Sequence, residues 1–495
     1  METVKTRKIS IKSWCILAGL LVFFLGMLAV CGVGVYNDSE QYITMHIHRE
    51  PLYPLFLAIF RQICGDGYLL VAAMAQNVLT AVSIWIFAEY VTSHFRLRAW
   101  EELLIVLLQL IPHLMTRYVS ALHIFLENSV MSEALCIPLF HFFVYFLFRM
   151  VFEQRRRDRF LSLAFAFLLS MTRGQMMTTI LMWMVIVLVQ MFLQKKCRML
   201  LIPITAVIVT FGLRSLTVHV YNYTVTGYFM GNTYAQVNTL TNVIYASDRE
   251  DGKVFDEGSL EREFFERFYD EADVLGANYR YGGSTFAERA AHLEDHHDVL
   301  KFQVLEADMS AYYFSLGKVD YYQQSSMSDE MAGRMLVKLL PVCFGQWLYD
   351  YILLCTYGFV RSIAVVHPVI SWIALILYGI AVGLALWQVV HGKHQSAARV
   401  TGRSCQDAVR GTDESCQDAA RAEGGSCRNV ARVRDRNCRD AAYVMGVALL
   451  FIAANVCATS MTIMCLSRYM IYGFSLFYTA LFLLVREKWS KNQIQ

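Results

Sequence analysis

Residues 14–35 read WCILAGLLVFFLGMLAVCGVGV, and residues 36–54 continue with YNDSEQYITMHIHREPLYP. The first stretch contains no charged residue and is long enough to cross the hydrocarbon core of a bilayer as one helix. The second stretch gathers acids, histidines, an arginine and prolines in one short connection. We therefore expect a membrane helix followed by a loop of ionisable side chains that lies at one membrane surface.

The composition of the whole chain extends this interpretation. Of its 495 residues, 56% are hydrophobic and 17% are charged, and the mean hydropathy is +0.40. A typical soluble domain has about a quarter of its residues charged. The sequence therefore predicts an all-α polytopic membrane protein with about ten transmembrane helices, interfacial helices and one extracytoplasmic domain. The expected spans are 14–35, 68–91, 102–117, 131–152, 160–173, 175–194, 199–220, 369–391, 442–464 and 468–486.

Charge is distributed unevenly along the chain. Basic residues cluster in the short turns between spans, whereas residues 244–334 hold 20 acidic and 9 basic side chains. Basic turns normally stay in the cytoplasm, so we expect the acidic segment outside, in a multi-pass protein of the cell membrane. Because the first run lacks a small-residue cleavage site, we expect an uncleaved anchor in the lipid bilayer. The net charge of +3 gives no indication of a nucleic-acid partner.

These patterns predict five parts along the chain. The aromatic residues of 344–366 favour a helix in the membrane interface; if this helix crossed the bilayer, the C-terminal part would face the opposite side. No cysteine lies between Cys197 and Cys343, so internal disulfides cannot hold the acidic domain. The expected parts are an N-terminal transmembrane catalytic module at 1–220 with the first outer loop at 36–67, an extracytoplasmic acidic domain at 221–343, an interfacial helix plus a transmembrane helix at 344–391, a cytoplasmic 11-residue cysteine-repeat linker at 392–441, and a C-terminal transmembrane hairpin with a basic tail at 442–495.

Two patterns raise the question of a metal. Cysteines recur every 11 residues, a period that keeps one stripe of a helix aligned, but zinc sites favour short Cys-x2–4-Cys pairs. We interpret this repeat as a duplicated low-complexity linker. His292 and His296 share one helix face, yet a solvated acidic helix explains them as well. The repeated cysteines are Cys405, Cys416, Cys427 and Cys438.

Polar residues that are far apart in the sequence are expected at one outer level of the bundle. Placing an acidic side chain at the membrane edge costs free energy, so such acids are usually paired or functional. This favours one shared site. Plainer interpretations stay open, because outer loops are polar anyway and an arginine at a helix end often extends only to the interface. The residues that the topology places at this level are Asp38, Glu40, Glu127, Glu133, Arg173 and Arg468.

Acids and arginines at one membrane level favour one kind of chemistry. A carboxylate takes the proton of a hydroxyl or amine as that group attacks. Arginines hold a phosphate leaving group and stabilise its growing charge. If the phosphate belongs to a lipid carrier, the carrier tail stays in the bilayer while the phosphate meets the site.

The order of short motifs resembles one family. One span precedes D-x-E-x-Y at 38–42, and REPLYPL at 49–55 then opens a helix that ends in Gly-Asp-Gly. LIPHLMTRYVS followed by SEAL, the helix end LSMTRG, and SRYMIYGFSLFY at 467–478 complete the order. In this order the chain resembles the C-type polytopic glycosyltransferases, near the bacterial protein-mannosyltransferase-like and aminoarabinose-transferase-like branch. The resemblance covers 14–194 and 442–486, and leaves the acidic domain and the cysteine repeat without a counterpart.

The resemblance implies an integral membrane transferase. Such an enzyme moves a sugar from a polyprenyl-phosphate-linked donor to an extracytoplasmic glycan, lipid or protein acceptor with inversion, and its active site faces the extracytoplasmic side. Asp38 and Glu40 resemble the acids of the first loop, but Ser39 separates them here, so either is the expected base. The residues expected to bind substrate are Tyr42, Arg49, Glu127, Glu133, Arg173, Arg468 and Tyr469.

The cofactor and the exact activity stay open at this point. Some branches of the family bind a divalent metal, so whether this chain needs a metal stays open. The sequence shows no clear set of metal ligands beyond Asp38 and one other acid. Gly174 also replaces the proline that is common in the family after the arginine. A transporter or flippase, or a polymerase, of lipid-linked glycans is the alternative function. The chain contains neither GxxxxGK[ST], which binds nucleotide phosphates, nor the GxSxG elbow of serine hydrolases.

Overall fold

A computed structural model describes the chain except residues 1–9, 120–122, 197–198, 318, 402–413 and 493–495. Side chains are not described at 391–435 and 490–492. The described residues form helices, joined by turns and by one isolated backbone bridge. This agrees with the predicted all-α class.

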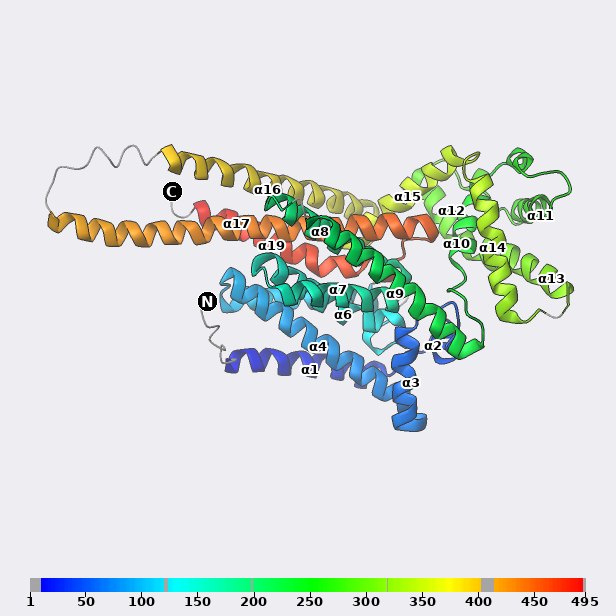
Figure 1. Cartoon of the computed structure of the whole chain (residues 1–495), viewed down its shortest axis with the longest axis horizontal. Helices are drawn as coiled ribbons and strands as arrows, with labels where there is room; N and C mark the ends of the chain where they lie inside the picture. Colours follow the sequence, from blue (N-terminus) through cyan, green and yellow to red (C-terminus); the bar gives the residue numbers. More distant parts are fainter. Residues whose placement is uncertain (1–9, 120–122, 197–198, 318, 402–413, 493–495) are drawn as a thin grey trace.

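Long helices run side by side along the longest axis of the molecule (Figure 1). α1 begins and α19 ends at the end of this bundle opposite the shorter helices. The bundle helices are α1 (Ile11–Cys31), α4 (Tyr68–Phe95), α5 (Ala99–Tyr118), α6 (Ser132–Phe152), α7 (Arg156–Thr172), α8 (Met177–Leu193), α9 (Leu201–Thr226), α16 (Pro368–Thr401), α17 (Glu414–Thr462) and α19 (Tyr472–Asn492).

Short helices gather at the other end of the bundle (Figure 1). We call residues 233–339, which run from just before α10 to the end of α14, the α10–α14 unit. The elements at this end are α2 (Ser39–Ile43), α3 (Leu52–Cys64), η1 (Gly65–Gly67), η2 (Leu126–Asn128), η3 (Gly174–Met176), α10 (Ala235–Tyr245), η5 (Arg249–Val254), α11 (Leu260–Val274), η6 (Tyr279–Tyr281), α12 (Phe286–Val299), the π-helical η7 (Leu300–Glu306), α13 (Ala307–Ser315), α14 (Tyr321–Leu339), α15 (Phe344–Ile363) and α18 (Ser467–Met470).

Eight described helices are long and apolar enough to cross a membrane, or nine if α14 and α15, bent by 112°, count as one span. Two of the ten expected spans fall short of this standard. α7 has only 17 residues and begins with charged residues. α19 carries Arg486, Glu487 and Lys488 in its last turns. Both still lie beside apolar helices, α7 against α6 and α8, and α19 against α17.

The helix expected in the interface at 344–366 is α15. With 20 residues it is long enough for a membrane span, but it is not apolar enough to count as one on its own. It contacts α12 of the α10–α14 unit as well as α17, α18 and α19 of the bundle. An ion pair between Arg289 and Asp350, 2.7 Å apart, joins α12 to α15. α15 therefore connects the α10–α14 unit to the bundle.

The boundaries expected for the cysteine-repeat linker fall inside helices. α16 continues to Thr401, and α17 runs as one helix from Glu414 to Thr462. Cys438 is buried on α17, where that helix enters the bundle. Cys405 lies outside the described residues, and the side chains of Cys416 and Cys427 are not described.

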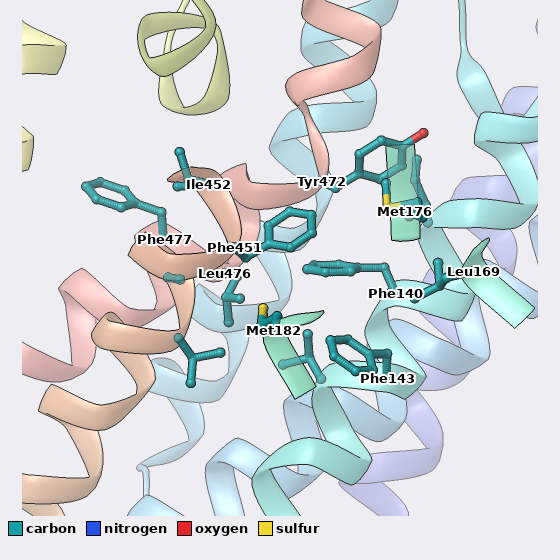
Figure 2. Close-up of a cluster of buried hydrophobic side chains, with 14 of the residues drawn as sticks. Phe140, Phe143, Leu169, Met176, Met182, Phe451, Ile452, Tyr472, Leu476 and Phe477 are labelled. Atoms are coloured by element: carbon teal, nitrogen blue, oxygen red, sulfur yellow. The ribbon is translucent and has the colours of Figure 1, made fainter. Parts of the chain in front are cut away.

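The hydrophobic core of the bundle joins helices from both ends of the sequence (Figure 2). The ring centroids of Phe140 on α6 and Phe451 on α17 are 4.3 Å apart. Met182 of α8 lies in the same cluster, as do Leu476 and Phe477 of α19. The C-terminal helices therefore complete the core that the N-terminal helices begin.

The α10–α14 unit has a core of its own. On α11, Phe264, Phe268 and Ala272 recur every four residues and are buried, the pattern of an amphipathic helix. Ser259 caps this helix by accepting the N–H of Arg262. The unit thus buries apolar side chains without a disulfide among its described residues.

The close packing of α17 against α19 gives a test of the bundle. A methyl group at Gly473 would come within 2.6 Å of Ile452 Cγ1, in the packed cluster of Figure 2. We expect Gly473→Ala to lower the free energy of unfolding by about 1–3 kcal/mol, because an overpacked core must shift. Gly446→Ala on α17 is the matched control, since its methyl group would meet nothing within 4 Å. Thermal unfolding in detergent measures both, and equal melting temperatures would contradict this packing.

Candidate functional site

The backbone fixes the connection after α1 to the segment before α6. α1 ends at Gly32, whose φ of 68° is a conformation that glycine adopts without strain. Gly34 donates its N–H to the carbonyl of Asn128 at 3.0 Å, and its own carbonyl accepts the N–H of Val130 at 2.8 Å. The connection that carries residues 36–43 therefore lies beside the first turn of α6.

Two amide side chains of α4 hold the same junction from within the bundle. Gln76 Nε2 and Asn77 Nδ2 donate to the carbonyl of Glu127, at 2.8 and 3.0 Å. The hydroxyl of Tyr53 on α3 donates to Gln76 Oε1 at 2.7 Å. Buried polar groups are stable only when they are hydrogen-bonded, so these contacts fix η2 against α3 and α4.

Five charged side chains from four segments meet at this end of the bundle. Asp38 Oδ1 accepts a hydrogen bond from Arg49 Nη2 at 2.9 Å, and Asp38 Oδ2 lies 3.1 Å from Arg468 Nη2. Arg468 Nε lies 3.8 Å from Glu133 Oε1, and Glu133 Oε2 lies 2.6 Å from Arg173 Nη1. We call these five residues the ion cluster.

Two tyrosines support the guanidinium groups of the ion cluster. The Arg49 guanidinium lies 4.8 Å from the centre of the Tyr42 ring, and the Arg173 guanidinium lies 4.7 Å from the centre of the Tyr469 ring. Ser132 Oγ lies 2.9 Å from the Tyr42 hydroxyl and accepts a hydrogen bond from Arg173 at 3.1 Å. The rings thus hold the arginine planes by cation–π contact.

The ion cluster extends from the interior toward the surface. The side chain of Glu133 is 1% exposed, and that of Asp38 is 31% exposed. Three guanidinium groups face two carboxylates, which leaves one positive charge in surplus. Among the described residues, the buried Nε–H groups of Arg173 and Arg468 have no hydrogen-bond partner. Because arginine donors match the oxygens of phosphate, the ion cluster is suited to bind one oxyanion.

The charge state of Asp38 follows from its two arginine partners. Burial raises the pKa of Asp38, but the positive charges of Arg49 and Arg468 outweigh burial and hold this pKa below its ordinary value. Asp38 is therefore ionised at neutral pH and able to accept a proton. An anion that draws the two arginines away would raise the pKa of Asp38 and make it a stronger base.

Two residues expected at the site lie outside the ion cluster. Glu40 is exposed on α2, and it has no ion-pair partner within the described parts of the chain. Glu127 is fully buried, and its Oε1 lies 2.6 Å from Nδ1 of His113 on α5. The other expected residues, which are Asp38, Tyr42, Arg49, Glu133, Arg173, Arg468 and Tyr469, meet in or against the ion cluster.

The sequence reasoning missed a second buried ion pair beside the ion cluster. Glu50 pairs with Arg214 of α9, and burial raises the pKa of Glu50 to about 7 although Arg214 opposes this shift. A methyl group at Gly174 would come within 3.3 Å of Glu50 Oε1, so a side chain there would crowd the carboxylate. The available signal was Arg214 itself, because a charged residue inside an apolar span indicates a buried partner.

Two histidines of the first loop contact the α10–α14 unit. His48 Nδ1 lies 2.9 Å from the Thr233 hydroxyl, and the His48 ring stacks on Tyr234 with centroids 4.2 Å apart. The ring of His46 meets the edge of Tyr321 at 5.3 Å. The segment that carries Arg49 is therefore covered by the start of α10 and by α14.

A polar cavity of about 300 Å³ opens between the α9–α10 connection and α14. Its wall includes Thr233, which contacts His48, so the cavity borders the first loop. Hydroxyl, amide and carboxyl groups of this kind suit a hydroxylated ligand. The lining residues are Gly231, Asn232, Thr233, Gln236, Ser326, Asp329, Glu330 and Gly333.

The described residues contain no group of three or more His, Cys, Asp or Glu side chains that could hold a metal ion. The histidines considered from the sequence have structural partners. His292 Nδ1 lies 2.9 Å from the Tyr245 hydroxyl, and its Nε2 lies 2.9 Å from the carbonyl of Gly276. His296 Nδ1 lies 2.9 Å from the carbonyl of His292.

No known protein family matches the chain, and neither a curated protein nor a solved structure is similar to it. The resemblance seen in 14–194 and 442–486 therefore stays a prediction.

Glu133 gives a direct test of the ion cluster. Glu133→Gln leaves Arg173 and Arg468 without their buried carboxylate, so we expect the free energy of unfolding to fall by about 3–5 kcal/mol. Glu40→Gln, at an exposed acid without such partners, should leave stability unchanged. Thermal unfolding in detergent compares the two variants. The pairing would be refuted if they unfolded together, or if Glu133→Gln combined with Arg173→Gln were less stable than Glu133→Gln alone.

The contact between the first loop and the α10–α14 unit should depend on pH. Burial, aided by the charges of His46, Lys301 and Arg49, holds the pKa of His48 well below its ordinary value. In the unfolded chain His48 takes a proton below about pH 6.5, whereas in the folded chain it stays neutral, so acid favours opening. We expect amide protection around Thr233 to fall between pH 7.5 and pH 5.5.

Hydrogen exchange of the wild type and of His48→Gln measures this effect. The variant removes the titrating ring, so its loss of protection between the two pH values should be smaller than that of the wild type. His367→Gln, at an exposed histidine, is the control and should behave as the wild type does. Identical pH dependence in all three proteins would show that His48 does not govern the contact.

Proposed function

We propose that the chain is an integral membrane glycosyltransferase that moves a sugar from a polyprenyl-phosphate-linked donor to an extracytoplasmic acceptor with inversion. The observation that carries this proposal is Asp38, which lies between the guanidinium groups of Arg49 and Arg468. A proton acceptor and an oxyanion site within contact distance are the two functions that such a transfer needs.

Binding of the donor phosphate would activate Asp38. Phosphate oxygens and the Asp38 carboxylate compete for the same guanidinium donors, so a bound phosphate weakens the pairs that now lower the pKa of Asp38. Arg173 would stay paired with the more buried Glu133, which keeps the inner half of the ion cluster in place. The base thus gains strength only when the donor is present.

The transfer step balances as a single displacement. The acceptor oxygen or nitrogen forms a bond to the anomeric carbon of the sugar while the bond from that carbon to the phosphate oxygen breaks. The electron pair of the breaking bond goes to the phosphate, and the proton of the acceptor goes to Asp38. The arginines of the ion cluster stabilise the charge that grows on the leaving phosphate.

The position of the ion cluster fits a lipid-linked donor. It lies where α1, α7 and α18 begin or end, at the end of the bundle that carries the α10–α14 unit (Figure 1). The basic turns between α4 and α5, between α6 and α7 and between α8 and α9 lie at the opposite end, which favours the extracytoplasmic side for this one. A phosphate at headgroup level would then reach the ion cluster while its polyprenyl tail stays among the apolar helices.

The polar cavity beside Thr233 is the proposed place for the acceptor. Its amide, hydroxyl and carboxyl groups offer both donors and acceptors of hydrogen bonds to a hydroxylated molecule. The contact from Thr233 to His48 joins its wall to the loop that carries Asp38 and Arg49. A transporter of lipid-linked glycans would need the same phosphate site but would leave the bond between sugar and phosphate intact.

Replacement of Asp38 separates these functions. We expect Asp38→Asn to reduce transfer by about 10²–10⁴-fold, because the amide cannot accept the proton of the acceptor. The purified protein is incubated with undecaprenyl-phosphate sugars and candidate acceptors, and mass spectrometry measures released undecaprenyl phosphate and product. The wild type should release carrier, and Glu40→Gln should remain active.

Two results would overturn the proposal. Full transfer by Asp38→Asn would remove Asp38 as the base. No released carrier from the wild type with any donor and acceptor offered, while it still binds the donors, would favour transport over transfer. Arg249→Ala, at an exposed ion pair with Asp270 in the α10–α14 unit, controls for a general effect of substitution on the preparation.

A further inference from the structure

We propose that His113 holds a proton inside the bundle, paired with Glu127, and that one water molecule in the adjoining cavity accepts a hydrogen bond from His113 and donates one to His141. The ligands of this site are a proton and a water molecule. The site uses none of the five residues of the ion cluster, so this inference does not depend on the proposed function.

Glu127 is buried in a place where its charge needs a cation. Its side chain is 0% exposed, and its Oε1 lies 2.6 Å from Nδ1 of the His113 ring, which is 2% exposed. Among the described residues, neither oxygen of Glu127 makes a well-aligned hydrogen bond. An ionised carboxylate in such a place is costly without an opposite charge. A protonated Glu127 would in turn leave its hydroxyl without an aligned acceptor, so the close contact is best satisfied by a carboxylate facing an imidazolium.

The surroundings of His113 strengthen this charge interaction. The ring of Phe24 on α1 meets the His113 ring edge to face, with centroids 5.2 Å apart, and helps to separate it from bulk water. Charges attract more strongly where water is excluded. The titratable groups that face His113 are Glu127 of η2 and, across the cavity, His141 and Tyr472.

A cavity of about 20 Å³ lies beside His113, between α5, α6 and the start of α19. His113, His141 and Ser475 supply polar side chains to its wall, and Phe140 is one of the apolar residues that complete it. A buried water needs about 10–15 Å³ and two to four polar partners. The cavity meets both conditions for one water molecule.

Hydrogen bonds around the cavity fix the direction in which this water is bonded. Ser83 donates its one hydroxyl proton to the carbonyl of Thr80 at 2.8 Å, so its oxygen accepts the proton of His141 Nδ1 at 3.0 Å. A neutral His141 with its proton on Nδ1 offers Nε2 as an acceptor. Ser475 likewise donates to the carbonyl of Leu108 at 3.3 Å, which leaves its oxygen able to accept. The water therefore donates to His141 and to Ser475.

His113 supplies the donor that this water needs. Nδ1 of His113 faces Glu127, so Nε2 is the ring nitrogen left for the cavity. In an imidazolium Nε2 carries a proton, and the water then makes three hydrogen bonds, the usual number for a buried water. A neutral His113 with its proton on Nδ1 would present a further acceptor, and none of the three polar wall residues would donate to the water. The cavity thus gives a second reason for a protonated His113.

The bound proton supports the segment that fixes the first loop. Glu127 belongs to η2, and the carbonyl of the next residue, Asn128, accepts the N–H of Gly34 at 3.0 Å. Loss of the proton from His113 would leave Glu127 as a buried charge without compensation and would favour release of η2. The site thus links a protonation inside the bundle to the loop that carries Asp38.

NMR of the full chain in detergent, with ¹⁵N-labelled histidine, measures the proton on His113. At pH 8 an unperturbed histidine is neutral, so an imidazolium signal at this pH identifies a histidine whose surroundings hold it charged. We expect such a signal in the wild type, its loss in His113→Gln, and its conversion to a neutral signal in Glu127→Gln, where no carboxylate holds the proton. His94→Gln, at a histidine paired with Asp440 at the other end of the bundle, is the matched control and should retain the His113 signal.

Two results of this measurement would overturn the pairing. One is a neutral His113 in the wild type. The other is an imidazolium signal that persists in Glu127→Gln, because the proton would then not depend on the carboxylate.

The same labelled protein tests the water. A cross-peak between the proton on His113 Nε2 and a slowly exchanging water is expected in the wild type. Ser475→Val, whose two methyl groups occupy the cavity, should remove this cross-peak, whereas Ser475→Ala leaves room for the water and should retain it through His141. A wild type without the cross-peak, or a cross-peak that survives Ser475→Val, would show that no water bridges the two histidines.

Stability gives a measurement that needs no assigned spectrum. Between pH 7 and pH 8.5 the unfolded chain has Glu127 ionised and His113 neutral, whereas the folded pair keeps one proton. Folding therefore takes up this proton, so rising pH favours unfolding. The unfolding equilibrium constant should rise with pH more steeply in the wild type than in Glu127→Gln, by about tenfold per pH unit. Denaturant unfolding in detergent compares the two proteins, in which all other groups titrate alike, and equal slopes would overturn the inference.

Discussion

The need to neutralise charge at the end of an apolar bundle is the constraint on which the rest of this structure depends. Glu133 and Arg173 are too buried to be stable as isolated ions, so each requires the other at close distance. Arg468 extends this pairing to Asp38, and Asp38 extends it to Arg49. Helices from the beginning and the end of the chain must therefore pack in one arrangement.

Backbone and side-chain amide hydrogen bonds fix the geometry in which these charges pair. The bridge through Gly34 fixes the first loop to the start of α6, and Gln76 and Asn77 hold η2 from inside the bundle. The aromatic core between α6 and α17 aligns the two halves of the bundle (Figure 2). Without these uncharged contacts, the same arginines and acids could pair in several ways.

The α10–α14 unit is part of this arrangement and not a separate module. Its ion pairs to α15 and its ring contacts to the first loop close the end of the bundle over the ion cluster. Lys301, Tyr234 and His48 form one line of contact from this unit to Arg49.

The sequence by itself determined the helical class, the position of most long helices and the set of acids and arginines available at one level. These follow from the length and spacing of apolar runs, which are local properties. Two expected spans were too short or too charged, and both boundaries of the expected linker 392–441 lie inside helices, α16 and α17. Only the tertiary structure decided which charges meet. Glu127 pairs with His113, whereas Glu133 pairs with Arg173 and Arg468. Ion pairs between residues hundreds of positions apart depend on how helices pack, and no local pattern encodes that packing.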